Sequence, residues 1–433
     1  MKKWLNGMDS YKSKMPTKVD PTKLSVREKF LLKDSKTFCT IPWTHLHAYP
    51  DGNAYPCCLA EHKFPIGSMK ENTIEELWNS PKQKQIRKNM LEEKKSVECR
   101  KCYEQESHGW TSMRQSSNIH FGHHVDKVKE TREDGHYEDV NMIYWDIRFS
   151  NLCNLSCRSC GSMFSSNWYD DQTALFGKPN HDKITYAGTT KMDAYDQLLE
   201  HMPKVEQIYF AGGEPLIMEE HYKILKELIR LGKADTVRLI YNTNFTRMAY
   251  KDLNVLDIWP EFKQVSVGAS LDAMGPRAEV VRNGTVWADV ERNREEMLKK
   301  CPQVDFYISP TVSVMNVDHI PDFHRDWMSK GFLGASDLHM NILQDPNHYR
   351  IDILPETLKQ QFKQKIEEHM SFIKSEDNLQ RAYNGLQSVI NFMMAEDKTH
   401  LLPQFVQITK QLDARRKQKL QDVAPELKEI FSG

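Results

Sequence analysis

Six short apolar runs, with stretches of helical spacing between most of them, organise the middle of the chain and constrain its fold most strongly. Their composition is that of buried strands, and they are Met142–Phe149, Val205–Phe210, Val237–Tyr241, Val265–Ser270, Val304–Ile308 and Leu338–Leu343. Helical patterns between them include Ala194–His201, Glu220–Leu231 and Val290–Lys300. Such alternation implies parallel strands with right-handed crossovers. The pattern predicts an α/β fold, an incomplete (β/α)6 TIM-like barrel over residues 141–345.

The remainder of the chain divides into four segments. Residues 1–36 are polar and lysine-rich and predict an N-terminal arm. Residues 37–115 are rich in cysteine and predict a compact module, whereas residues 116–140 are charged and predict a connection. Residues 346–433 predict a C-terminal helical extension, with helices at Glu356–Lys374, Asp377–Ala395 and Pro403–Lys419.

Composition narrows the class of protein. The net charge of −1 gives no general attraction to nucleic acid or to an anionic membrane. No apolar run approaches the roughly 20 residues of a membrane-spanning helix, and the N-terminus lacks the apolar core of a signal peptide. We therefore expect a cytoplasmic protein with no membrane or nucleic-acid partner. Nine cysteines in such a chain indicate metal or cluster ligation rather than disulfides.

Three cysteines with the spacing CxxxCxxC follow the first predicted strand. Cys153, Cys157 and Cys160 lie within eight residues of one another. Three thiols on one loop can hold three corners of an iron–sulfur cluster and leave the fourth iron open for reaction. A zinc site usually needs four ligands, and no fourth Cys or His lies close downstream. The spacing therefore predicts a catalytic cluster.

Polar or glycine-rich motifs follow the next predicted strands, at the edge where barrel sites are built. Glycines allow close approach of the backbone, a carboxylate can accept from an ammonium group, and an arginine can grip a carboxylate with two hydrogen bonds. The structural alternatives are a tight turn, a helix N-cap and a surface charge. The residues are Gly212, Gly213, Glu214, Pro215, Asn242, Ser270, Asp272 and Arg282.

Together these motifs resemble, in order and spacing, the radical SAM superfamily. The resemblance implies a 4Fe–4S cluster on Cys153, Cys157 and Cys160, with S-adenosylmethionine (SAM) bound to its open iron. It places Gly212, Gly213 and Glu214, within the Gly-Gly-Glu-Pro motif, at the methionine amine. Ser270 and Arg282 would lie near the carboxylate and ribose, with Asn242 and Asp272 close by. One departure is Ser159, where the family commonly has an aromatic residue near adenine, so that contact is expected elsewhere.

The N-terminal cysteines form a second pattern. Pro50-Asp51-Gly52-Asn53 predicts a hairpin turn between Cys39 and Cys57. Thr73 and Glu76 form a capping box that opens an amphipathic helix, and Cys99-Arg-Lys-Cys102 follows it. These elements can converge four thiolates on one centre, and a zinc ribbon is the alternative.

This second pattern resembles the auxiliary-cluster module of radical SAM enzymes called SPASM, or its shortened form, twitch. The matching positions are Cys39, Gly52, Cys57 and the helix from Asn72 to Trp78. The resemblance implies an auxiliary iron–sulfur cluster, of the 4Fe–4S type, on Cys39, Cys57, Cys99 and Cys102. Cys58 either replaces one ligand or is buried. In most relatives the module follows the barrel, whereas here it precedes it.

The resemblance also implies a reaction. An electron from a flavodoxin- or ferredoxin-like donor would cleave SAM, and the resulting 5′-deoxyadenosyl radical would remove hydrogen from a substrate. A fully ligated auxiliary cluster would then accept an electron, which predicts net oxidation of a peptide or protein side chain. The alternatives are a sugar or nucleotide dehydrogenase or rearrangement enzyme, and a non-catalytic zinc or iron–sulfur scaffold.

Three charged or histidine motifs have simpler interpretations. His45 and His47 on the predicted hairpin are interpreted as ordinary residues, and His123-His124 as solvated. The run Asp413–Lys417 is interpreted as a solvated helix face. The alternative is that this tail folds over the barrel mouth and offers Asp413 or Arg416 to the substrate.

Overall fold

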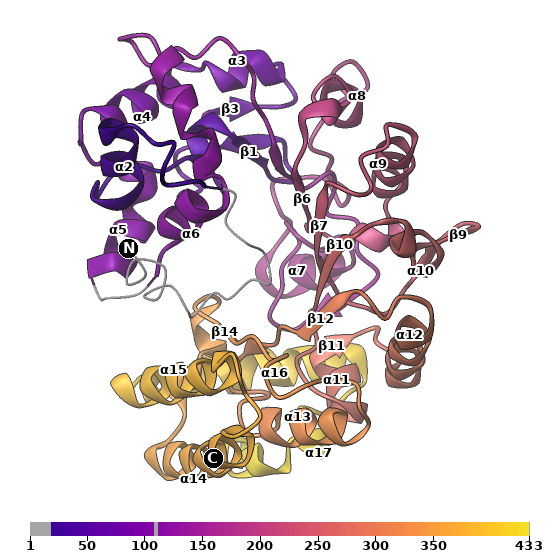
Figure 1. Ribbon diagram of the computed structural model, residues 1–433. Coiled ribbons are helices and arrows are strands. Elements are labelled where there is room, and N and C mark those ends of the chain that lie inside the picture. The colour runs from indigo at the N-terminus through magenta and orange to yellow at the C-terminus, as the bar shows by residue number, and fades with distance from the viewer. Residues whose placement is uncertain (1–18, 108–110, 433) are drawn as a thin grey trace. The chain divides into compact units, whose positions relative to one another are not determined.

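The computed structural model describes residues 19–107 and 111–432 (Figure 1). The chain forms two compact units. The first comprises residues 1–150, 185–212 and 220–240, and the second comprises residues 151–184, 213–219 and 241–433. Residues 1–18, half of the predicted N-terminal arm, lie outside the described residues. Within the described part, no helix has the length and apolar character needed to cross a membrane.

The first unit opens with a helix rather than an arm. α2 (Val26–Lys33) begins at a capping box formed by Ser25 and Glu28, and Leu31 and Leu32 are buried. Burial of this leucine pair explains why residues 26–33 are helical although their overall composition is polar. The apolar face of this helix is too short to produce a recognisable helical period in the sequence.

The cysteine-rich part of the first unit contains the two predicted local structures. β1 (His45–Ala48) and β2 (Asn53–Tyr55) form a hairpin whose turn contains Gly52 at φ 92°, a conformation that favours glycine. The Thr73 capping box opens α3 (Ile74–Trp78) with both of its hydrogen bonds formed. The hairpin and the capping box are thus confirmed.

Helices continue through the segment predicted to be a charged connection. α4 (Pro81–Leu91) and α5 (Arg100–Ser107) are followed by α6 (Met113–His120) and by the 3-10 helix η4 (Gly122–Glu130). Ser117 and Asn118 of α6 are buried. Residues 116–130 are therefore a packed, helical part of this unit, within the segment that the sequence predicts to be a charged connection.

The hairpin joins a parallel sheet. β1 pairs in parallel with β4 (Tyr144–Ile147), which sets His47 opposite Asp146, and β4 pairs in parallel with β6 (Gln207–Phe210). β2 and the short β3 (Gly67–Ser68) extend the sheet in the antiparallel sense. α8 (Ala194–Leu199) precedes β6, and α9 (Glu219–Arg230) connects β6 to β7 (Arg238–Thr243). The end of β7, from residue 241, belongs to the second unit.

The second unit contains the later predicted strands. β10 (Gln264–Ala269) and β12 (Asp305–Ile308) pair in parallel, and α11 (Gly275–Val281) and α12 (Trp287–Lys300) lie between them in the chain. The sixth predicted strand is broken. Its Leu338 bridges Ile308, whereas β14 (Asn341–Ile342) pairs with β13 (Thr311–Val312).

The C-terminal part of the second unit is helical, as the sequence predicts. After α13 (Ile320–Ser329) the helices are α14 (Glu356–Ile373), α15 (Arg381–Ala395), α16 (Leu402–Arg416) and α17 (Leu420–Val423). α14 and α15 pack together through buried apolar residues such as Phe362 and Leu386. The molecule is a mixed α/β protein with parallel strands.

Candidate functional site

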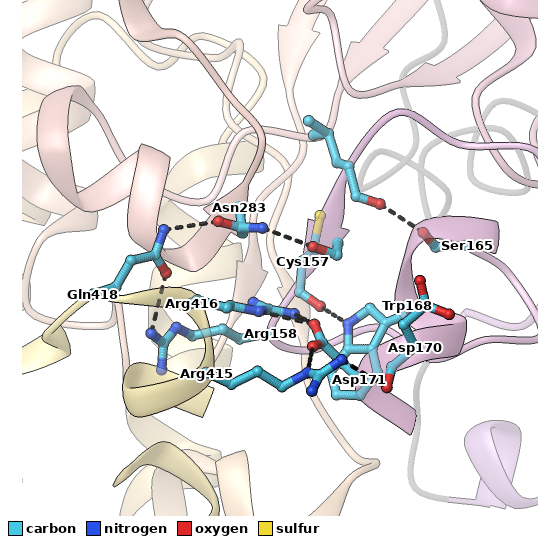
Figure 2. Close-up of polar contacts among 12 residues, drawn as sticks. Cys157, Arg158, Ser165, Trp168, Asp170, Asp171, Asn283, Arg415, Arg416 and Gln418 are labelled. Atoms are coloured by element: carbon cyan, nitrogen blue, oxygen red, sulfur yellow. Dashed lines mark hydrogen bonds and ion pairs between the residues drawn. The ribbon is translucent and has the colours of Figure 1, made fainter. Parts of the chain in front are cut away.

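The CxxxCxxC loop lies in the second unit and is shaped by a two-residue ribbon. β5 (Ser156–Cys157) pairs in the antiparallel sense with β11 (Arg282–Asn283), which sets Cys157 opposite Arg282. The main-chain N–H of Cys160 donates to the carbonyl of Cys157 at 3.0 Å. The indole N–H of Trp168 donates to the same carbonyl (Figure 2). The ribbon and this tight turn keep the three thiols on one short loop.

The electrostatic setting of the three thiols fits a cluster. Burial raises the pKa of Cys153 and Cys157, and it raises that of Cys160 to about 12. Neighbouring thiols raise the pKa of Cys153 and Cys160 further, whereas Arg282 and Arg416 oppose the effect at Cys157. Ionising these thiols without a metal costs free energy, because they are shielded from water and their negative charges would repel one another. Iron compensates that cost, because thiolate is the form that binds metal.

Arg282 is engaged by the protein itself. Its Nε lies 2.8 Å from Asp272 Oδ2, and its Nη2 donates to Oδ1 at 3.0 Å. Its Nη1 lies 3.6 Å from Cys157 Sγ. The sequence predicts both Arg282 and Asp272 near SAM, and in the structure these two buried opposite charges pair with each other. In the structure the pair holds Cys157.

The Gly-Gly-Glu-Pro motif packs directly on the cysteine loop. The N–H of Glu214 donates to the carbonyl of Leu152 at 2.8 Å. A Cβ on Gly213 would lie only 2.1 Å from that oxygen, and Gly212 has a φ of 121°. Pro215 begins the 3-10 helix η7 (Pro215–Ile217). Contact with the loop is therefore a sufficient reason for glycine at position 213.

Glu214 joins the loop to the end of β7. Its carboxylate accepts from Thr243 Oγ1 and the N–H of Asn244, both at 2.7 Å, and from the N–H of Leu216 at 3.1 Å. Burial raises its pKa to about 7, and these hydrogen bonds and Arg282 oppose that rise. A carboxylate offers about four lone-pair directions. The hydrogen bonds from Thr243, Asn244 and Leu216 occupy three of them.

Asn244, two residues after the predicted SAM neighbour Asn242, contacts the cysteine loop. Asn244 Nδ2 donates to Asn154 Oδ1 at 2.9 Å and lies 4.0 Å from Cys153 Sγ. Asn242 instead lies beside Gly268 of β10. The N–H of Ser270 donates to the carbonyl of Thr243 at 2.7 Å and prolongs the strand pairing. The Asn-Thr-Asn sequence was the available signal, and tertiary packing decided which asparagine reaches the loop.

Four N-terminal cysteines surround one space in the first unit. Cys39, Cys57, Cys99 and Cys102 line a space of about 440 Å³, part of it open to solvent. Burial raises the pKa of all four thiols. Four thiols around one space fit a fully ligated cluster, and the donor set alone also suits zinc.

Cys58 lies within electrostatic reach of Cys57 and Cys102. It is not among the described residues that line the space. Burial raises its pKa to about 12, and the next contributions come from Asp146 and Arg148. The structure therefore distinguishes the adjacent cysteines, with Cys57 in the set and Cys58 outside it.

Two side chains of α6 fix the backbone around Cys39. Asn118 Oδ1 accepts from the N–H of Thr40 at 2.9 Å, and its Nδ2 donates to the carbonyl of Phe38 at 3.1 Å. Arg114 Nη1 donates to the same carbonyl at 2.8 Å. The sequence gives no sign of these two roles, because Arg114 and Asn118 contact residues more than 70 positions earlier in the chain.

His123 and His124 are hydrogen-bonded rather than solvated. Their Nε2 atoms lie 3.0 and 2.8 Å from the two oxygens of the Glu206 carboxylate. Each imidazole can donate its Nε2–H to Glu206, so no ion is needed to satisfy the group. His123 Nδ1 is buried and has no hydrogen-bond partner among the described residues, whereas a metal-bound imidazole is normally held through its second nitrogen. The group is best described as a polar triad.

His45 and His47 are both buried. His45 Nδ1 lies 2.9 Å from the carbonyl of Tyr144, and His47 Nδ1 lies 2.9 Å from Asp146 Oδ2. Burial raises the pKa of Asp146, but His47 and Arg148 outweigh it and hold the pKa well below its usual range. The two histidines thus anchor β1 to β4.

The tail at residues 413–417 is only partly solvated, since Ala414, Arg415 and Lys417 are exposed whereas Asp413 and Arg416 are half-buried. Asp413 pairs with Arg158, directly after Cys157. Arg416 pairs with Asp171 (Figure 2). Because both charges are engaged by residues near the cysteine loop, this tail is not free to offer them to a substrate.

Comparisons with known proteins agree with the N-terminal site. Residues 39–103 match the SPASM family, an iron–sulfur cluster-binding domain. This match confirms the module predicted from Cys39, Gly52, Cys57 and the helix at α3. No curated protein matches the chain.

Solved structures show only distant likenesses. Native anSMEcpe with bound AdoMet and Cp18Cys peptide is 20% identical with a TM-score of 0.35, over 52% of this chain and 57% of that one. TYW1 with a lysine-pyruvate adduct bound is 11% identical with a TM-score of 0.30, over 54% of this chain and 71% of that one. This chain thus spans little more than half the length of the first structure. These values are too low to support an activity.

Proposed function

We propose, from the premise that residues 39–103 are a SPASM iron–sulfur cluster-binding domain, that this chain is a radical SAM enzyme. In this proposal residues 141–345 form the incomplete (β/α)6 barrel and residues 346–433 its helical extension. The observation that carries the proposal is the contact between the two motifs of the second unit. Gly213 and Glu214 contact the main-chain carbonyl of Leu152, which begins the CxxxCxxC loop. Arg282 contacts the sulfur of Cys157 in the same loop.

The chain's own residues would act on the cofactors as follows. Cys153, Cys157 and Cys160 would hold the catalytic 4Fe–4S cluster. Glu214 would orient the SAM amine with its remaining lone-pair direction. When bound, the cluster and SAM supply a 5′-deoxyadenosyl radical that removes hydrogen from the substrate. Asn244 and the Arg282–Asp272 pair would keep the cysteine loop in position.

The four-thiol site supports the type of reaction. If Cys39, Cys57, Cys99 and Cys102 all bind iron, no iron is left for the substrate. Electron acceptance is then the remaining role, and the net reaction is an oxidation. We propose a peptide or protein side chain as the substrate and a flavodoxin- or ferredoxin-like protein as the donor, in the cytoplasm.

Anaerobic reconstitution tests the proposal. Protein treated with iron and sulfide should bind about eight irons per chain, the content of two cubane clusters. Dithionite and SAM should then yield 5′-deoxyadenosine. Replacing Cys153, Cys157 and Cys160 by alanine should abolish this product and leave about four irons. Zinc in place of iron, with no 5′-deoxyadenosine, would overturn the proposal.

A further inference from the structure

The C-terminal end of α16 contacts the cysteine loop through a buried ion pair. Asp413 Oδ1 pairs with the guanidinium of Arg158, whose side chain is 0% exposed. Arg158 follows Cys157 directly, and its Nε donates to the carbonyl of Val280 at 3.1 Å. The other oxygen of Asp413 accepts from the N–H of Leu420 at 3.0 Å. Asp413 thus ties the loop to the turn that ends α16.

A second ion pair lies beside the first. The Nε and Nη2 of Arg416 lie 3.0 and 2.7 Å from Asp171 Oδ2, and Arg415 Nε lies 2.5 Å from Oδ1. The Arg416 guanidinium is also 5.5 Å from the ring centroid of Trp168. Figure 2 shows these groups gathered at the main-chain carbonyl of Cys157, which Trp168 hydrogen-bonds.

A neutral side chain completes the contact. Gln418 Nε2 donates to Asn283 Oδ1 at 2.8 Å, and Asn283 Nδ2 donates to Ser156 Oγ at 2.8 Å (Figure 2). Gln418 Oε1 also accepts from Arg158 at 3.4 Å. The tail therefore reaches both strands of the β5–β11 ribbon that sets Cys157 opposite Arg282.

The tail is anchored again further along. Arg277 of α11 lies 2.8 Å from Glu426, and its Nε donates to the carbonyl of Val423 at 2.8 Å. α11 leads directly into Arg282. The chain after α16 thus contacts the protein both before Arg282, at Arg277, and after it, at Asn283.

These contacts have an electrostatic consequence. A charge buried away from water needs a partner, and removing one partner leaves the other uncompensated. The guanidinium of Arg416 lies 5.5 Å from the ring centroid of Trp168, and that indole donates to the carbonyl of Cys157, so the positive charge lies close to the cysteine loop. A cluster becomes more negative when it is reduced, so a nearby positive charge favours the reduced form.

We propose that residues Asp413–Gln418 are a strap that positions the cluster-binding loop, and that Arg416 makes the cluster held there easier to reduce. The inference rests on the proposed function only in assuming that Cys153, Cys157 and Cys160 bind a cluster. Asp413 and Arg416 are positioning residues, since they act through Arg158, Asp171 and Trp168.

Reconstituted full-length R416Q and D413N test the strap, with K410Q as the matched control. Lys410 is an exposed residue of the same helix. The measurements are iron retained against a chelator, the melting temperature, and an EPR-monitored reductive titration without SAM. R416Q and D413N should lose iron toward about four per chain, whereas K410Q should behave as wild type.

The sign of the potential shift separates electrostatics from simple loosening. R416Q removes a positive charge and should shift the potential of the loop cluster to more negative values. D413N leaves Arg158 uncompensated and should shift it to more positive values. Compared with R416Q, the variant R416K should restore the reduction potential more fully than it restores iron retention. Lysine keeps the positive charge but cannot make the two hydrogen bonds of Arg416 to Asp171.

Three outcomes overturn three different statements. Wild-type iron retention and unchanged potentials in both variants would overturn the strap. Shifts of the same sign in both would overturn the electrostatic role of Arg416. If the wild type binds no more iron than the variant lacking Cys153, Cys157 and Cys160, the proposed function fails instead, because the loop then holds no cluster.

Discussion

At the residue scale, Glu214 links the candidate SAM site to pH. Its pKa of about 7 in the folded protein exceeds the ordinary 4.5 because burial disfavours the charged form. The stabilisation that this shift provides is complete below about pH 4.5 and is lost as the pH rises through about 7. The full effect is roughly 3 kcal/mol.

We predict that E214Q removes this pH dependence. Glutamine cannot ionise, but its amide leaves one donor of the site unpaired, so the variant should be less stable at pH 5. Its deficit in unfolding free energy relative to wild type should shrink between pH 5 and 8. Urea denaturation of apoprotein across this range measures the difference, with E295Q at an exposed position as the control. A constant deficit would contradict the prediction.

A second residue-scale prediction concerns Gly213. Alanine there would place Cβ 2.1 Å from the carbonyl oxygen of Leu152, so the cysteine loop must move. We expect G213A to lose about four of about eight irons on reconstitution. G161A is the matched control, because a Cβ on Gly161, in the same loop, meets nothing within 4 Å. Iron analysis that finds G213A equal to G161A would refute this account.

At the element scale, α6 supports the SPASM segment from outside the matched residues. N118A would leave the buried N–H of Thr40 without its partner and remove one donor to the carbonyl of Phe38. Each buried group left unpaired costs about 1–3 kcal/mol. We expect faster loss of iron from the N-terminal site to a chelator, whereas S116A on the same helix should leave it unchanged. Equal rates would show that α6 does not hold Cys39 in place.

At the scale of the whole molecule, the two cysteine sites belong to different compact units. We therefore expect each to load independently. C57S should lose about four irons and keep the loop cluster, whereas C58S should keep about eight. The reason is that, of these two adjacent cysteines, Cys57 lines the four-thiol space and Cys58 does not. Mössbauer spectra and iron analysis of the two variants measure this. Equal losses would mean that Cys58 is also a ligand.

Local chemistry was readable from the sequence where it depended on near neighbours. The Gly52 turn, the capping box at Thr73 and the strand and helix pattern each follow from a few adjacent residues. The α2 helix and the packing of residues 116–130 were missed because their stability comes from tertiary burial of short apolar faces. The two-part sixth strand was missed because pairing partners, not composition, decide where a strand breaks.

The sequence by itself determined which residues bring the chemistry, since thiol spacing and the glycine–glutamate motif are local properties. Only the tertiary structure decided how those residues are used. It paired Arg282 with Asp272, brought Asn244 to the cysteine loop, placed Cys57 at the four-thiol space and brought Asp413 and Arg416 to Arg158 and Asp171. The physical reason is that a buried charge or donor must find a partner, and partners up to 260 positions away meet only when the chain has folded.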